Sequence, residues 1–443
     1  MKIFRRILLF VMMAVLAMTA LFACGGSGGG DSSVDEEGNI DMNKRIVIRF
    51  AAPEGEFGEE IKAFAAGFNK KYPNITIKYE PISGAWDEKL LGQLGSGTAP
   101  DVFWTDSIYK FASRNALEPL DDYFTKYNVD KNDYYESMME SGQYQGNQYM
   151  LPREYNHVVI FYNKKLFRDT FKDPNNLPFT PVEGTVYPAN GWTWSEFVET
   201  SKAFVKKQDG NVVQRGADLS FSWGSSGPQI LLGLGGKIAN EDGMSIDFNN
   251  ETNKKILQNL KDLIDMGAFV NNVKVDVGDI FSGRVAMVVN SRPATMDMEN
   301  KFGDDWDVVS FPELPIPMVG TGSSGYVMNR ASKVKEAAAQ LLFYMISEEG
   351  QQIFMETGNC VPVLKSLRDS DVWRTMPRAD INHEAFLYKP ENDVLAYRFM
   401  LGTPSAVGNF ETEWKNFVTA YLNGDKSVAE ALEYGQKQLS SIF

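Results

Sequence analysis

The chain has 443 residues, of which 43% are hydrophobic and 12% aromatic, and its formal net charge is −14. A surface this acidic repels the phosphate backbone of nucleic acids, so no nucleic-acid partner is expected. The length exceeds what one hydrophobic core comfortably holds, so the sequence predicts two domains.

The first 30 residues have the pattern of a lipoprotein signal. Three basic residues within the first six positions precede an apolar run over 7–20, and Leu21-Phe22-Ala23-Cys24 is followed by glycines and a serine. This pattern predicts a signal peptide over 1–23, lipidation of Cys24 and an extracytoplasmic protein anchored to a bacterial cell membrane. A plain cleaved signal and an uncleaved anchor are the alternatives, although the apolar run is short for a span of about 20 residues.

Removal of residues 1–23 takes away three basic and no acidic residues, so the net charge changes from −14 to −17. Such a surface does not adhere to anionic lipid, so a covalent lipid is the expected means by which the protein is attached to the membrane. Residues 24–43 are rich in glycine, serine and acids, which predicts a flexible tether. With Cys24 lipidated, Cys360 has no partner for an intrachain disulfide and is expected to be a small buried residue.

From residue 45 onward, strand and helix patterns alternate. Strands are expected at 45–50, 75–79 and 100–104, with helices around 61–68 and 86–94 between them. This β-α-β-α-β order predicts an α/β fold with a parallel sheet covered by helices. Ligands of such sheets lie beyond the carboxyl ends of the strands, so the loops 51–57, 80–86 and 104–109 are expected to share one rim.

Later segments continue the mixed pattern. The sequence predicts a helix that begins at Trp194 with Thr193 or Ser195 as its cap. Further strands are expected at 148–152, 158–162, 285–289 and 325–329, and further helices at 228–235, 252–266, 333–357, 410–422 and 427–441.

The order and spacing of these segments resemble family 1 of the extracellular solute-binding proteins of ABC importers, which includes maltose-binding protein. The resemblance is carried by residues 46–70, 100–106, 117–123, 148–152, 161–167, 192–197, 281–287, 331–338, 347–351 with 357–358 and 361–362, and 427–432. It implies a periplasmic-binding-protein-like fold of two lobes, each a sheet flanked by helices, with a ligand cleft between them. By analogy, lobe 1 comprises 44–156 and 312–363, and lobe 2 comprises 157–311 and 364–443. It also implies a monomer that closes by hinge bending on a carbohydrate, an oligosaccharide, and delivers it to ABC permease subunits.

A sugar-binding cleft needs aromatic rings for the apolar sugar faces and carboxylates or amides for the hydroxyls. Trp104 and Asp106 follow a buried strand at the rim, and the resemblance places a sugar-contacting Trp and Asp at this strand end. Core packing is the alternative for Trp104, and a helix cap is the alternative for Asp106. Asn156 lies at the implied first crossing between lobes, where it is a ligand contact or a turn residue.

Six further residues are candidate ligand contacts. Trp223 lies on a glycine- and serine-rich loop, and Tyr326 follows a glycine- and serine-rich segment that would let a ligand approach. Glu54 and Trp86 lie on the other rim loops, with solvent exposure or packing as the alternative role. Arg292 is a candidate with a solvated surface charge as its alternative, and Phe410 is a further aromatic candidate.

Motifs for catalysis and cofactors are missing from the sequence. It has two histidines, no zinc-binding His or Cys spacing, no Gly-x-Ser-x-Gly elbow and no phosphate-binding loop. We therefore expect no enzyme, no metal site and no cofactor. A receptor for a polyamine or another charged small solute, a secreted glycosidase or polysaccharide lyase, and an adhesive surface lipoprotein are the alternative functions.

Overall fold

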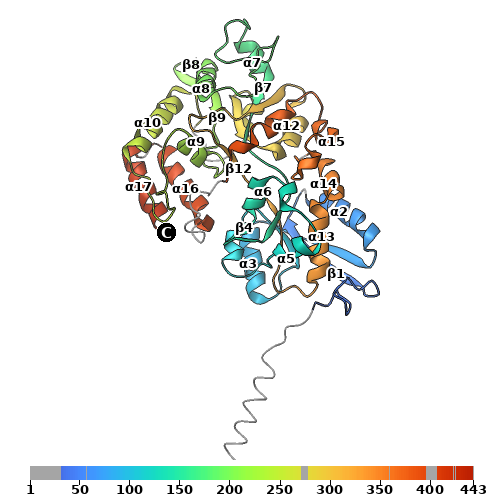
Figure 1. The fold of residues 1–443 in the computed structure, drawn as a ribbon. Helices are drawn as coiled ribbons and strands as arrows, with labels where there is room; N and C mark the ends of the chain where they lie inside the picture. The colour runs from blue at the N-terminus through green and yellow to red at the C-terminus, as the bar shows by residue number, and fades with distance from the viewer. Residues whose placement is uncertain are drawn as a thin grey trace, which may run out of the picture.

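The computed structural model describes residues 31–442 apart from 56, 271–277, 359, 396–406, 423 and 425. Two five-stranded sheets, each flanked by helices, form two lobes that lie one above the other in Figure 1. The expected α/β, two-lobed architecture is confirmed. The signal segment and Cys24 lie outside the described residues. Within the described part of the chain, no helix combines the length and the apolar character needed to cross a membrane.

Lobe 1 is built on a sheet with strand order β2-β1-β3-β13-β6. The first three strands are parallel, as expected, whereas β13 runs antiparallel to β3 and β6. The elements of this lobe are β1 (Ile46–Pro53), α2 (Phe57–Lys71), β2 (Ile75–Ile82), α3 (Trp86–Ser96), β3 (Val102–Thr105), α4 (Tyr109–Ala112), α5 (Asp121–Lys126), η1 (Lys131–Asp133), α6 (Glu136–Ser141), β4 (Gln143–Tyr144), β5 (Asn147–Gln148), β6 (Met150–Pro152), β13 (Gly325–Met328), α13 (Lys335–Ile346) and α14 (Glu348–Met355).

Apolar periodicity explains the start of lobe 1. Alternate residues of β1 are buried from Ile46 to Phe50, and α2 buries Ile61, Phe64 and Phe68 at helical spacing. β1 pairs with β2 over eight residues in register, from Ile46 opposite Ile75 onward. This arrangement brings the carboxyl ends of β1, β2 and β3 to one edge of the sheet.

The helix expected over 333–357 is two helices. α13 ends at Ile346, Ser347 has an extended conformation (ψ 168°), and α14 begins at Glu348. The Ser347 hydroxyl accepts a hydrogen bond from the Gly350 amide, which caps α14. Amphipathic periodicity continues across the break, so the sequence pattern alone did not reveal it.

Lobe 2 is built on a sheet with strand order β11-β7-β10-β9-β8, in which β10 is parallel to β9 and antiparallel to β7. Thr193, and not Ser195, caps α8 in a reciprocal capping box with Glu196. The elements are β7 (Val159–Asn163), α7 (Lys164–Thr170), α8 (Trp194–Ala203), β8 (Lys206–Gln208), β9 (Asn211–Asp218), α9 (Gly227–Gly233), α10 (Glu251–Met266), α11 (Gly278–Phe281), β10 (Val285–Asn290), η2 (Arg292–Ala294), α12 (Thr295–Phe302), β11 (Trp306–Ser310), α16 (Val407–Leu422) and α17 (Val428–Ser440).

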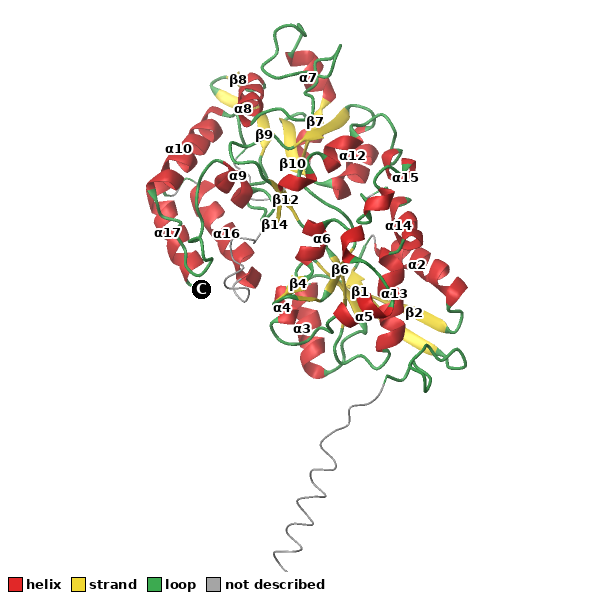
Figure 2. Cartoon of the chain, in the orientation of Figure 1, coloured by secondary structure: helices red, strands yellow, loops and turns green. Residues whose placement is uncertain are grey.

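Several chain segments pass between the two sheets. Residues 153–158 connect β6 to β7, and residues 311–324 connect β11 to β13. A short parallel pair, β12 (Val319–Thr321) with β14 (Asp393–Leu395), lies between the sheets (Figure 2). The remaining short elements are η3 (Lys365–Leu367), α15 (Asp371–Arg374), η4 (His383–Leu387) and η5 (Pro390–Asn392). These passages connect the two sheets.

The tether expected over residues 24–43 includes residues that the structure places against lobe 1. Residues 31–43 lie against lobe 1, where Ser33 is fully buried and Ile40 joins the core. The Asp31 carboxylate accepts a hydrogen bond of 2.6 Å from the backbone amide of Glu336, in the first turn of α13. A carboxylate at a helix N-terminus is favourable because it satisfies an otherwise unpaired amide. One of the acidic residues that suggested a tether, Asp31, therefore makes a helix-capping contact.

Candidate functional site

A cleft of about 460 Å³ opens between the two lobes. Lobe 1 lines it with the carboxyl ends of β1 and β3 and the start of α3, and lobe 2 with the loop before α9, η2 and α16. Its lining residues are Pro53, Phe57, Trp86, Trp104, Asp106, Ser107, Tyr109, Ser141, Arg153, Glu154, Asn156, Trp223, Ser225, Pro293, Thr321, Gly322, Ser323, Ser324, Leu395 and Glu411. The rim expected from the strand order therefore contributes to one side of the cleft.

Aromatic rings gather on the lobe 1 wall. Trp104, at the end of β3, lies between Trp86 and Phe57, with ring centroids 5.0 and 5.2 Å apart. The ring planes are tilted by 60° and 56°, so the three rings form an angled apolar surface instead of a flat stack. All three rings also remain part of the cleft lining. Trp86 and Trp104 thus lie in the cleft, as the sequence predicted.

Lobe 2 contributes a fourth ring, that of Trp223. The loop before α9 is held by backbone hydrogen bonds from the Trp223 amide to Ser220 (2.9 Å) and from the Ser226 and Gly227 amides to the Trp223 carbonyl (2.9 and 3.0 Å). The short Gly-Ser sequence permits this tight turn. Trp223 lines the cleft from lobe 2, so a ligand in the cleft would be contacted by rings from both lobes.

Two polar atoms in the cleft have no partner among the described residues. They are the indole Nε1 of Trp104, a donor, and the carboxamide Oδ1 of Asn156, an acceptor, and both atoms are shielded from solvent. Leaving a buried polar atom unpaired costs about 1–3 kcal/mol. This donor and this acceptor lie beside one cleft, and a hydroxyl-bearing ligand would satisfy them once the side chains that cover them shift.

Asp106 lies on the loop after β3. Its carboxylate faces the cleft and has no hydrogen bond or ion pair with another side chain in the part of the chain that the structure describes. The side chain is exposed to the solvent of the cleft, whose walls stand around it. This enclosure, followed by the negative charges of Asp87 and Glu411, raises the pKa of Asp106 to about 6. Its alternative role is not observed, because Ile108 is the N-cap of α4 and no side chain caps that helix.

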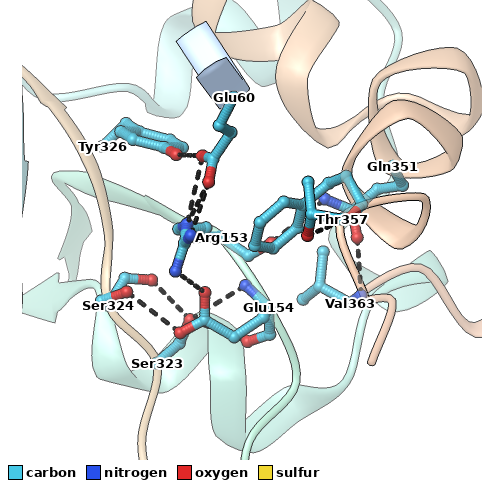
Figure 3. A network of polar contacts seen from close by, with 10 residues as sticks. Glu60, Arg153, Glu154, Ser323, Ser324, Tyr326, Gln351, Thr357 and Val363 are labelled. Atoms are coloured by element: carbon cyan, nitrogen blue, oxygen red, sulfur yellow. Dashed lines mark hydrogen bonds and ion pairs between the residues drawn. The ribbon is translucent and has the colours of Figure 1, made fainter. Parts of the chain in front are cut away.

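Figure 3 shows a buried network of charges, of which Arg153 and Glu154 line the cleft. We call this network, Glu60, Arg153 and Glu154, the floor of the cleft. Arg153 donates to the Glu60 carboxylate through Nε (3.1 Å) and Nη2 (2.5 Å), and to Glu154 through Nη1 (3.2 Å). The Tyr326 hydroxyl also donates to Glu60. Arg153, Glu60 and Glu154 are 5%, 4% and 3% exposed. Desolvation alone would lower the pKa of Arg153, but Glu60 and Glu154 outweigh it and hold that pKa well above its usual range.

The network also fixes parts of the lining. The Arg153 guanidinium lies over the Phe57 ring at 4.9 Å, and Ser324 donates to Glu154 at 3.0 Å. The Ser323 hydroxyl donates to the Glu154 carbonyl at 2.8 Å, so both serines of the 322–324 turn are held. Burial raises the pKa of Glu154, and the neighbouring Arg153 partly offsets this effect.

Two predicted contacts, Arg292 and Tyr326, are buried away from the cleft. The sequence placed Arg292 in the cleft, but it is fully buried in lobe 2, where it donates to the Trp373 carbonyl at 2.9 Å and pairs with His383 at 3.0 Å. Burial lowers the pKa of Arg292 to about 10. Tyr326 is 1% exposed and lies opposite Trp104 in the sheet, beneath the lining. Both predictions are wrong because the side chains point into the protein.

Phe410 and Glu54 are also not part of the cleft lining. Phe410 is fully buried and packs in α16 against Trp414, with ring centroids 6.0 Å apart. Glu54 is exposed and accepts a hydrogen bond from Ser83, so it lies on the rim, whereas its neighbour Pro53 lines the cleft. An apolar helix position favours the core for Phe410.

Several lining residues are not among the contacts that the sequence predicts. Phe57 sits at the start of α2, inside a loop that was expected to form the rim, so its position was a usable signal. Arg153 and Glu154 follow the strand at Met150–Pro152, and Arg153 pairs with Glu60, which is 93 residues away in the sequence. Glu411 belongs to a helix of lobe 2 whose approach to lobe 1 has no local signal in the sequence.

Among the described residues there is no group of three or more His, Cys, Asp or Glu side chains arranged to hold a metal ion. Cys360 is a free, fully buried thiol, as expected, and burial raises its pKa well above the usual range. The site that the structure presents is thus a cleft with aromatic walls and hydrogen-bonding groups.

Two lobes around such a cleft define a two-lobed binding protein. The comparisons agree with this class. The family model for bacterial extracellular solute-binding proteins matches residues 51–352, and the chain belongs to this family.

Relatives and solved structures extend the comparison. An uncharacterized ABC transporter extracellular-binding protein of Pyrococcus horikoshii is 29% identical over 181 residues, which is 39% of this chain and 41% of that protein. A maltotriose-binding protein of Pyrococcus abyssi is 32% identical over 135 residues, 27% of this chain and 28% of that protein. The matches thus span well under half of these relatives. The structure is similar in fold to an ABC substrate-binding protein of Listeria monocytogenes in complex with cycloalternan, with a TM-score of 0.72, 19% identity, and coverage of 90% of this chain and 99% of that one.

Proposed function

We propose that this protein is the extracytoplasmic solute receptor of an ABC importer and that it binds a carbohydrate, an oligosaccharide, in the cleft between its lobes. The observation that carries the proposal is the lining of the cleft. Trp86 and Trp104 on one lobe and Trp223 on the other offer faces for sugar rings, and the open Trp104 N–H and Asn156 oxygen offer hydrogen bonds.

The relatives support the same ligand class. One is named as a maltotriose-binding protein, and one solved structure of similar fold holds cycloalternan. A cleft of about 460 Å³ falls within the range of small-ligand sites. Its lining contains more than one aromatic ring on which a sugar ring can stack. In this role the protein binds its ligand without chemical turnover and passes it to two permease subunits.

Attachment to the membrane belongs to the same proposal. Cys24 carries the lipid, and the chain reaches the body of lobe 1 at residue 31. The receptor is a monomer that works at the outer side of the cell membrane and has no nucleic-acid partner. Replacement of Cys24 by Ser should release the protein from the membrane fraction into the medium, and retention in the membrane would contradict the lipid anchor.

Ligand binding is tested by thermal shift and calorimetry with a panel of neutral oligosaccharides, polyamines and sugar phosphates. Stabilisation by an oligosaccharide, with no product formed on long incubation, is the expected result. Small-angle scattering should then give a smaller radius of gyration for the bound protein, because the lobes close on the ligand. Stabilisation by polyamines alone would mean that the ligand is a polyamine and not a carbohydrate. Release of shorter sugars would indicate a glycosidase.

A further inference from the structure

The charges around the cleft are unequal. Among the described residues, three carboxylates line it, those of Asp106, Glu154 and Glu411, and Arg153 is the one cationic side chain of that lining. Arg153 is already shared by Glu60 and Glu154. The floor is therefore formally left with one negative charge in a place that is almost fully buried, and buried charges are normally compensated.

The walls add to this excess on both lobes. Asp106 of lobe 1 has no side-chain partner among the described residues, and Glu411 faces the same cleft from α16 of lobe 2. Helices α4 and α16 contact each other beside it. Two nearby lysines do not cancel this charge. Lys110 is paired with Asp87, and Lys415 pairs with Glu411 at 3.1 Å in a half-exposed contact that water screens.

Closure of the lobes would bring the lobe 1 and lobe 2 carboxylates together while removing water from them. Neutral hydroxyls can donate hydrogen bonds to these oxygens, but they leave the like charges uncompensated. A cation between them removes the repulsion and gains charge-assisted hydrogen bonds. The open carboxamide oxygen of Asn156 is one more acceptor for the same donor, and the tryptophan faces attract a cation as well.

We infer that the carbohydrate is a basic one: a sugar that bears a protonated amine, held between Asp106 of lobe 1 and Glu411 of lobe 2 above the negatively charged floor. This inference rests on the proposed function and adds the charge of the ligand to it. Anionic sugars are excluded by the same charge distribution.

The test compares the fully deacetylated glucosamine trimer, which carries basic amines, with its fully N-acetylated form, whose nitrogen atoms are uncharged. Maltotriose and spermidine are measured alongside. Calorimetry at pH 7 with the full mature protein should give at least about tenfold tighter binding of the amine trimer than of the acetylated trimer. Raising the salt concentration to about 0.5 M should reduce this preference, because salt screens charges.

Three variants assign the preference to the two carboxylates. Asp106→Asn and Glu411→Gln should each lower the preference for the amine severalfold, while Glu413→Gln, on the same helix but outside the cleft lining, should leave it unchanged. Circular dichroism and melting temperature establish that all three variants are folded.

The outcomes test the basic-sugar inference and the proposed function separately. Equal or tighter binding of the acetylated trimer or of maltotriose overturns the basic-sugar inference and leaves the carbohydrate receptor in place. Binding of spermidine with no binding of any trisaccharide overturns the proposed function itself. Failure of the amine trimer to bind overturns the inference whichever other compound binds.

Discussion

Replacement of Arg153 by Met should be one of the most damaging single changes in lobe 1. Arg153 is 5% exposed and donates to Glu60 and to Glu154. Met retains much of the apolar stem, but it leaves both buried carboxylates without a cation. Removal of one partner from a buried ion pair costs about 3–5 kcal/mol, and we expect a loss in this range for Arg153→Met. The Tyr326 and Ser324 hydroxyls still donate to the two carboxylates and keep the loss from being larger.

Urea denaturation followed by tryptophan fluorescence measures this loss, since Trp86 and Trp104 report on lobe 1. In the Arg153→Met background, Glu60→Gln should restore part of the stability, because one uncompensated charge is removed. Arg330→Met is the matched control, as Arg330 is exposed and is not in an ion pair with any described residue. A loss below about 1 kcal/mol for Arg153→Met would refute the role of the network.

Three further outcomes are expected. Trp104→Phe keeps a ring but removes the open N–H donor, so calorimetry should show affinity about threefold to tenfold weaker at unchanged melting temperature; unchanged affinity would mean that this donor makes no ligand contact. The pKa of Asp106 is raised to about 6, so a ligand that donates to its carboxylate should bind up to about tenfold more weakly per pH unit below 6. The unliganded protein should gain stability from this group as the pH falls from 6 toward 4, because the folded state binds the proton more tightly than the unfolded state. A flat affinity profile from pH 7 to 5 would contradict the ligand contact. Gly320→Ala should lower the stability by about 1–3 kcal/mol in thermal denaturation, because its Cβ would overlap the Ser225 backbone oxygen, and a variant as stable as the parent would show that the loop can move aside.

The sequence alone identified the features that depend on neighbours along the chain. The periodicity of Ile61, Phe64 and Phe68 is a property of one helix, and the structure confirms it. Trp104 lies at the end of a strand and Asp106 follows it directly, so their place at the carboxyl edge of the sheet follows from strand order. Trp223 was accessible to the same reasoning because a Gly-Ser turn displays it.

Tertiary structure decided which way side chains point and which distant residues meet. Arg292 follows a buried strand much as Asp106 does, yet Trp373 and His383 of a distant segment enclose it within lobe 2. Strand alternation could not distinguish the two faces available to Tyr326, whose hydroxyl reaches Glu60, 266 residues away. Long-range pairings of this kind depend on how whole elements pack, and the local pattern of the chain holds no record of that packing. The cleft charge is likewise a tertiary property, since Asp106 and Glu411 come together only when the two lobes are assembled.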